Sequence, residues 1–153
     1  MRIRKKNIFI FALLLMICGI CGCGSKEALT VDGFNGMMQE KGFHISDVTE
    51  HVKADYVEAI SLAIAEDYQI EFYVFSDSES AASVFEQNRS VFEEKSEEKG
   101  IQITKNLSNY SFFSIQESGV YRLVARIDNT MLYVVAEDVH KEEIVELIKE
   151  LGY

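Results

Sequence analysis

The stretch from Val120 to Ala136, VYRLVARIDNTMLYVVA, decides the fold, because apolar residues alternate with other residues on both sides of a two-residue turn. The turn is Asp128-Asn129, a pair that suits the positive φ angles of tight hairpin turns. An alternation with a period of two indicates strands with one apolar face, so the stretch predicts a β-hairpin. The alternating apolar residues are Tyr121, Leu123, Ala125 and Ile127 before the turn and Met131, Tyr133 and Val135 after it.

A second stretch of the same kind runs from Val57 to Phe75, VEAISLAIAEDYQIEFYVF, with Glu66-Asp67 as its turn. The two hairpins superpose at an offset of 61 residues, which pairs Leu62 with Leu123 and Phe72 with Tyr133. This match predicts that the chain contains an internal repeat. The alternating apolar residues of the second hairpin are Ile60, Leu62 and Ile64 before the turn and Tyr68, Ile70, Phe72 and Val74 after it.

A further match lies before each hairpin, where EKGFHIS (40–46) is similar to EKGIQIT (98–104). In both copies we expect a helix to end at the lysine, the glycine to take the left-handed conformation, and a strand to begin. The repeated unit would then be helix, strand and hairpin, over residues 30–76 and 88–137, closed by a helix over 139–151. The alternative is coincidence, because EKG is a common sequence and hairpins resemble one another.

Three segments place apolar residues at helical spacing. Thr30 is the expected N-cap of the first, the capping-box pattern Ser76-x-x-Glu79 opens the second, and Gly152 ends the third, which follows Asp138. Three amphipathic helices can cover strands that have one apolar face. We therefore expect a single α+β domain over residues 30–153, an antiparallel sheet of about six strands, or two three-stranded halves, packed on three helices. The apolar helix residues are Phe34, Met37, Met38, Ala81, Val84, Phe85, Val91, Phe92, Ile144, Leu147, Ile148 and Leu151.

The N-terminus, MRIRKKNIFIFALLLMICGICGCG, has four basic residues followed by the uncharged apolar run from Ile8 to Ile20. This order is typical of a secretory signal peptide. The run is shorter than the roughly 20 residues that span a bilayer as a helix. All three cysteines of the chain, Cys18, Cys21 and Cys23, lie at its end.

The tetrapeptide Ile20-Cys21-Gly22-Cys23 resembles the lipobox of bacterial lipoproteins, in which an aliphatic, a variable and a small residue precede the lipidated cysteine. The resemblance implies that residues 1–22 are a signal peptide and that Ile20, Cys21 and Gly22 are recognised by the signal peptidase. Cys23 would be the acylated N-terminus, and residues 23–29 a short tether. The protein would then lie on the extracytoplasmic face of the cell membrane, held by its lipid anchor.

Two alternatives for the cysteines are an uncleaved membrane anchor and a metal or redox site built on the C-x-x-C and C-x-C spacings. If Cys23 is acylated, Cys18 and Cys21 leave with the signal peptide and the mature chain has no free thiol. In its signal and its composition the chain also resembles small acidic lipoproteins of Gram-positive bacteria, a broad group that implies a location and no activity.

The mature chain is strongly acidic. Four of the 15 lysines and arginines lie in residues 1–22, which leaves 11 against 25 acidic residues and a net charge of −14. Such a chain does not offer the basic patch that nucleic acids require, so we expect no nucleic-acid partner. The expected partners are the membrane, through the lipid anchor, and a protein or other component of the cell envelope.

The sequence has no catalytic motif. The three histidines, His44, His51 and His140, lack the paired spacing of a zinc site, and there is no G-x-S-x-G elbow or glycine-rich phosphate loop. We therefore expect no cofactor, no metal and no enzymatic activity, with a hydrolase as the less favoured alternative.

Aromatic residues give the one indication of a binding surface. Tyr73 and Phe75 alternate away from the face of Phe72, and Phe112 and Phe113 are adjacent, so they cannot share a face of a strand. These four residues are the predicted ligand-binding residues; the alternative is that the other half of the domain or a second subunit covers them. The sequence thus predicts a non-catalytic binding or interaction module of unknown activity, or else an accessory subunit of a membrane transport or envelope-assembly complex.

Overall fold

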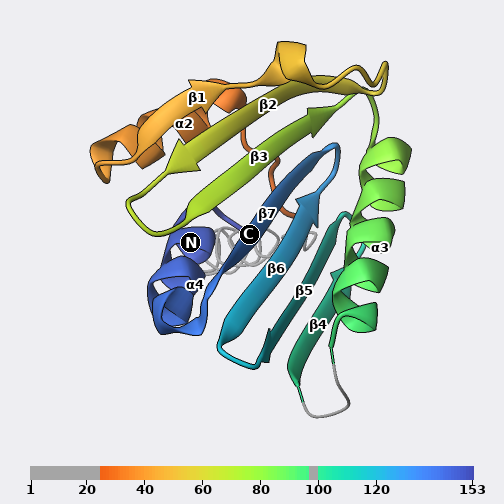
Figure 1. Ribbon diagram of the computed structural model, residues 1–153. Coiled ribbons are helices and arrows are strands. Elements are labelled where there is room, and N and C mark those ends of the chain that lie inside the picture. The colour runs from red at the N-terminus through yellow and green to blue at the C-terminus, as the bar shows by residue number, and fades with distance from the viewer. Residues whose placement is uncertain (1–24, 97–99) are drawn as a thin grey trace, which may run out of the picture.

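The structure, a computed structural model, describes residues 25–96 and 100–153, and the signal-peptide residues with Cys23 lie outside these ranges (Figure 1). No helix within them is long and apolar enough to cross a membrane. The helices are α2 (Val31–Glu40), α3 (Ser78–Glu94) and α4 (Lys141–Glu150), with short 3-10 helices η2 (Thr49–His51) and η3 (Asp138–His140). The strands are β1 (His44–Asp47), β2 (Val57–Ile64), β3 (Gln69–Phe75), β4 (Ile101–Leu107), β5 (Tyr110–Glu117), β6 (Val120–Ile127) and β7 (Thr130–Glu137).

All seven strands form one antiparallel sheet in the order β1-β2-β3-β7-β6-β5-β4. The α+β class and both predicted hairpins, β2–β3 and β6–β7, are confirmed. The two hairpins meet at the middle of the sheet, where β3 pairs with β7 (Figure 1). The expected number of about six strands was one too few, because β5 is a separate strand between β4 and the second hairpin.

Helices cover the two faces of the sheet unequally. On one face, α2 and α4 pack on a large core that includes the stacked rings of Phe34 and Phe72, 4.8 Å apart. On the other face, α3 packs on a smaller core that includes Phe85, Phe92 and Phe113 (Figure 1). The sheet therefore has an apolar core on each side.

The register of β2 on β3 contradicts the expectation that the alternating apolar residues of this hairpin form one apolar face. Phe72 lies opposite Ser61, whereas Leu62 lies opposite Glu71. Directly opposed residues share a face of the sheet, and Ser61 bonds Asn35 of α2 through its hydroxyl, 2.6 Å away. Leu62, with Ile60 and Ile64, therefore lies on the α3 face, not with Phe72 on the α2 face.

The internal repeat is not confirmed. The offset of 61 pairs Phe72, which lies on the α2 face, with Tyr133, which lies on the α3 face. The helices α2 and α3 also lie on opposite faces, whereas two copies related by the antiparallel β3–β7 pair would keep their helices on one face. The alternation was misleading because β6 and β7 carry apolar residues on both faces, so a period of two does not say which face is inward.

The helix ends agree with the sequence at α2 and differ at α3. The hydroxyl of Thr30 accepts from the backbone of Gly33 at 3.1 Å, and Gly42 has a φ of 88° after the helix, both as expected. The N-cap of α3 is Asp77, not Ser76, because the Asp77 carboxylate accepts the Ser80 N–H at 2.7 Å. This helix ends at Glu94, before the predicted end at Lys99.

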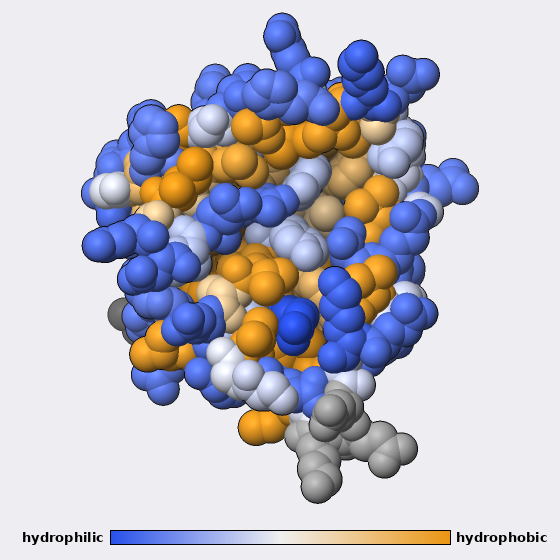
Figure 2. Space-filling view, in the orientation of Figure 1, coloured by the Kyte–Doolittle hydropathy of each residue, from blue (hydrophilic) through white to orange (hydrophobic). Residues whose placement is uncertain are grey.

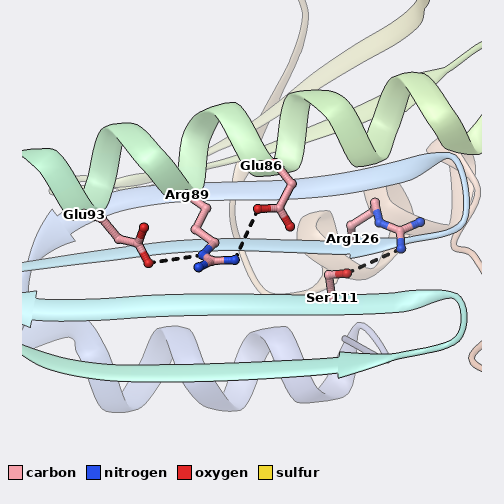
Figure 3. Close-up of polar contacts among 5 residues, drawn as sticks. All are labelled: Glu86, Arg89, Glu93, Ser111 and Arg126. Carbon is pink, nitrogen blue, oxygen red and sulfur yellow. Dashed lines mark hydrogen bonds and ion pairs between the residues drawn. The ribbon is translucent and has the colours of Figure 1, made fainter.

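Two arginines lie between α3 and the sheet (Figure 3). Arg89 of α3 bridges Glu86 and Glu93 at 3.2 and 3.1 Å, and its guanidinium lies 5.9 Å from the ring of Phe113. Arg126 of β6 is buried and donates to Ser111 at 3.4 Å and to the backbone carbonyl of Asp128 at 3.1 Å. The ion pairs with two residues of α3 hold the Arg89 side chain along the helix, close to the ring of Phe113.

A pair of neighbouring substitutions tests the assignment of faces. Ala63→Asp should destabilise the domain by about 4 kcal/mol or more, because it buries an unpaired carboxylate under α2. Leu62→Asp, one residue away on the α3 face, should lower the free energy of unfolding by only about 1 kcal/mol, because Leu62 is partly exposed. Urea unfolding of both variants measures the difference, and equal losses would contradict the assignment.

Candidate functional site

The α3 face of the sheet is only partly covered. In Figure 1, α3 lies over the β5–β6 side and, of β3, covers the end near Phe75; within the described residues, no helix lies over β2 and the rest of β3 on this face. Ile64 is half-buried there and Val135 of β7 is exposed. Figure 2 shows this face, where apolar residues gather on both sides of a more polar central band.

Two adjoining hollows form a groove on this face. The first, of about 420 Å³, lies between the loop 52–57, α3 and the strands β3 and β7. The second, of about 590 Å³, lies between the β2–β3 turn, the end of α3 and the strands β6 and β7. Glu71 and Tyr133 line both hollows, so they stand where the two meet. Each volume is in the range of ligand-binding cavities.

Glu71 is the centre of a polar cluster on the floor of the groove. Gln69 donates its amide to the Glu71 carboxylate at 2.9 Å, and the Tyr73 hydroxyl donates to the other carboxylate oxygen. All three side chains come from alternate positions of β3 and therefore share a face. Tyr133 lies directly opposite Glu71 on β7. Two donors thus fix the carboxylate beside two aromatic rings.

Burial and the Glu71 carboxylate change the acidity of both tyrosines. Burial raises the pKa of Tyr73, and the hydrogen bond to Glu71 and its negative charge raise it further. Burial, followed by the charge of Glu71, also raises the pKa of Tyr133, while the nearby cation of Arg122 partly opposes this. Both hydroxyls therefore stay protonated at neutral pH and can donate hydrogen bonds.

The four predicted ligand-binding residues do not form one patch. Tyr73 and Phe75 both line the first hollow, and their rings stack 6.1 Å apart. Phe113 is fully buried beneath α3, and Phe112 packs, partly buried, against the core on the opposite face. The adjacent phenylalanines diverge because β5 has a covered face on each side.

The sequence analysis missed Glu71, Gln69 and Tyr133. Their signal was present: in Gln69-Ile-Glu71-Phe-Tyr73, polar residues alternate with Ile70 and Phe72 and so occupy the second face of β3. Tyr133 could not be placed beside them, because the pairing of β3 with β7 joins residues 62 positions apart.

The three histidines lie on three separate elements of the structure. His44 lies on β1, His51 in η2 and His140 in η3, where its ring lies 5.1 Å from that of Tyr68. Within residues 25–96 and 100–153, no three histidine, cysteine or acidic side chains are placed to hold a metal ion.

Comparison with known proteins gives a fold likeness alone. The sequence matches no established protein family and no curated protein. A solved structure described as a GTP binding regulator, from Thermotoga maritima, is similar in fold, with a TM-score of 0.51. The likeness covers 84% of this chain and 90% of that chain at 16% sequence identity. At that identity it supports the α+β architecture and carries no ligand or activity to this chain.

The Glu71–Tyr73 contact can be tested by titration. Glu71→Gln removes the negative charge that disfavours tyrosinate, so the pKa of Tyr73 should fall toward its ordinary value and remain above it because burial persists. NMR titration of ring-labelled tyrosine measures the midpoint. Glu66→Gln, on the rim of the second hollow, is the matched control and should leave the pKa of Tyr73 unchanged. An unchanged midpoint in the Glu71 variant would refute the contact.

Proposed function

We propose that this protein is a lipid-anchored, extracytoplasmic binding module whose groove on the α3 face holds a segment of an envelope protein. The observation that carries the proposal is the pair of adjoining hollows that share Glu71 and Tyr133. The lipid anchor rests on the lipobox-like sequence that ends at Cys23.

The lining of the groove suits a polypeptide. Apolar side chains flank the polar floor, among them Val52 and Val84 in the first hollow and Ile64 and Val135 in the second. An extended peptide presents apolar side chains and backbone amides together, and the Glu71 carboxylate with the two tyrosine hydroxyls can bond such amides. Both hollows are open rather than enclosed, which suits a chain that continues beyond the site.

The charges of the groove also favour a partner with a basic residue. Glu66, Asp67 and Glu71 line the second hollow with Lys95 and Arg122. Glu71 lies at the junction beside the rings of Tyr73 and Tyr133, and carboxylates and aromatic faces both attract cations. The strongly acidic mature chain adds long-range attraction for a basic segment.

Acylation of Cys23 is tested by fatty-acid labelling in the native or a related bacterium. Cys23→Ser should lose the metabolic label and shift the protein from the membrane fraction to the soluble fraction, because the variant lacks the thiol that carries the lipid. Cys21→Ser is the matched control and should keep the label. Undiminished labelling of the Cys23 variant would refute acylation at Cys23.

Binding in the groove is tested by photo-crosslinking in intact cells. A photoreactive residue at Ile64 or Val135 should give a discrete adduct, and one at Val139, an exposed apolar residue in η3, should not. Glu71→Gln should reduce the adduct about tenfold, equivalent to 1.4 kcal/mol of binding free energy. Equal adducts at position 139 would refute the groove, and a captured permease or synthase would make the protein an accessory subunit.

A further inference from the structure

The N-terminal tether is fastened to one end of the sheet. The backbone N–H of Lys26 donates to the Asn109 side chain at 3.1 Å, and the Asn109 amide donates back to the Lys26 carbonyl at 2.7 Å. The Lys26 ammonium donates to the carbonyl of Gly152 at 2.7 Å and lies 4.0 Å from the centre of the Tyr110 ring. These contacts join residues more than 80 positions apart, so the tether has a fixed point at Lys26.

The fixed point limits how far the domain can lie from the membrane. Cys23 is three residues before Lys26, and three fully extended residues span at most about 11 Å. If Cys23 carries the lipid, the β4–β5 turn at Asn109 must lie close to the lipid headgroups. This step rests on the anchor proposed above.

The edge strand β4, which ends at this β4–β5 turn, is exposed and apolar. Every residue of the edge strand β4 is exposed, and three of them are large and apolar: Ile101 at 62%, Ile103 at 44% and Leu107 at 57%. The pairing of β4 with β5 is regular, and β4 contains no proline. Such an edge is an aggregation hazard that soluble proteins usually protect. We therefore expect another molecule to cover it.

The side chains of this edge share one face with the fastened tether. Lys105 lies opposite Phe112 and Leu107 opposite Tyr110, the residue over which Lys26 lies. The Lys105 ammonium lies 5.6 Å from the centre of the Phe112 ring. Burial, and then the charge of Lys105, lower the pKa of Lys26, so the two cations are near each other. Apolar and cationic side chains are thus combined where the tether leaves the domain.

We infer that β4 rests on the membrane, with Ile101, Ile103 and Leu107 in the interfacial layer and Lys105 and Lys26 among anionic headgroups. This combination of apolar and basic side chains is what interfacial segments use to bind lipid. The acidic remainder of the chain is repelled by the same headgroups, which favours this edge over the others. The proposed lipid-facing edge is therefore Ile101, Ile103, Lys105 and Leu107.

Tryptophan quenching by brominated lipid tests the inference, because the natural chain contains no tryptophan. The full-length protein, acylated in bacteria, is reconstituted in vesicles of phosphatidylglycerol and phosphatidylcholine with brominated acyl chains. Leu107→Trp and Ile103→Trp report on the edge. His44→Trp is the control, since His44 is exposed and lies on β1, at the edge of the sheet opposite β4. All three substitutions replace exposed side chains, so the fold should tolerate them.

We expect the tryptophan at position 107 to be quenched about twofold more than that at position 44, because interfacial side chains lie about 5–10 Å into the headgroup boundary. Lys26→Ala should reduce this difference by loosening the tether. Equal quenching at 103, 107 and 44 in vesicle-bound protein would overturn the edge assignment and leave the lipid anchor intact. Protein that does not float with the vesicles would overturn both. Crosslinking between two copies at position 107, with no quenching, would assign the edge to self-association instead.

Discussion

The pairing of β3 with β7 is the interaction on which the rest of the structure depends. It joins the two hairpins into one sheet through five opposed residue pairs, from Ile70 with Val134 to Val74 with Thr130. Each hairpin closes locally, and neither alone has enough buried surface to be stable. Once paired, Ile70, Phe72, Leu132 and Val134 form a continuous apolar floor for α2 and α4. On the reverse side the same pairing sets Glu71 beside Tyr133 and creates the groove.

Local signals in the sequence predicted the elements well and their faces poorly. The Asp128-Asn129 turn, the Thr30 cap and Gly42 each act within a few residues, and each is where the sequence placed it. The predicted apolar face of β2 was wrong: Ile60, Leu62 and Ile64 lie on the side of the groove, not on the side of Phe72. The pattern misled because β2 carries apolar side chains toward both α2 and the groove. A period of two identifies a strand, and it identifies the inward face only when the other side is polar.

The candidate site shows the same limit. Tyr73 and Phe75 were predicted from alternation within one strand, a local property, and they line one hollow. Phe113 was chosen because adjacent phenylalanines cannot share a face, but α3 covers the face that it occupies. Tyr133 and Arg122 join Glu71 only through strand pairings distant in sequence. A single sequence contains no signal for that proximity.

The position of the groove relative to the edge strand gives the proposed functions a common geometry. Ile103, Lys105 and Leu107 share the face of the sheet that carries α2 and α4, whereas Glu71, Tyr73 and Tyr133 lie on the face that carries α3. A domain that rests on lipid through the first set therefore turns the second set away from the membrane. If Cys23 carries the lipid, the tether is too short for the domain to turn over freely, because Lys26 is fastened to the sheet only three residues after Cys23. A partner in the envelope would then meet an open groove of fixed orientation, which lowers the orientational cost of binding.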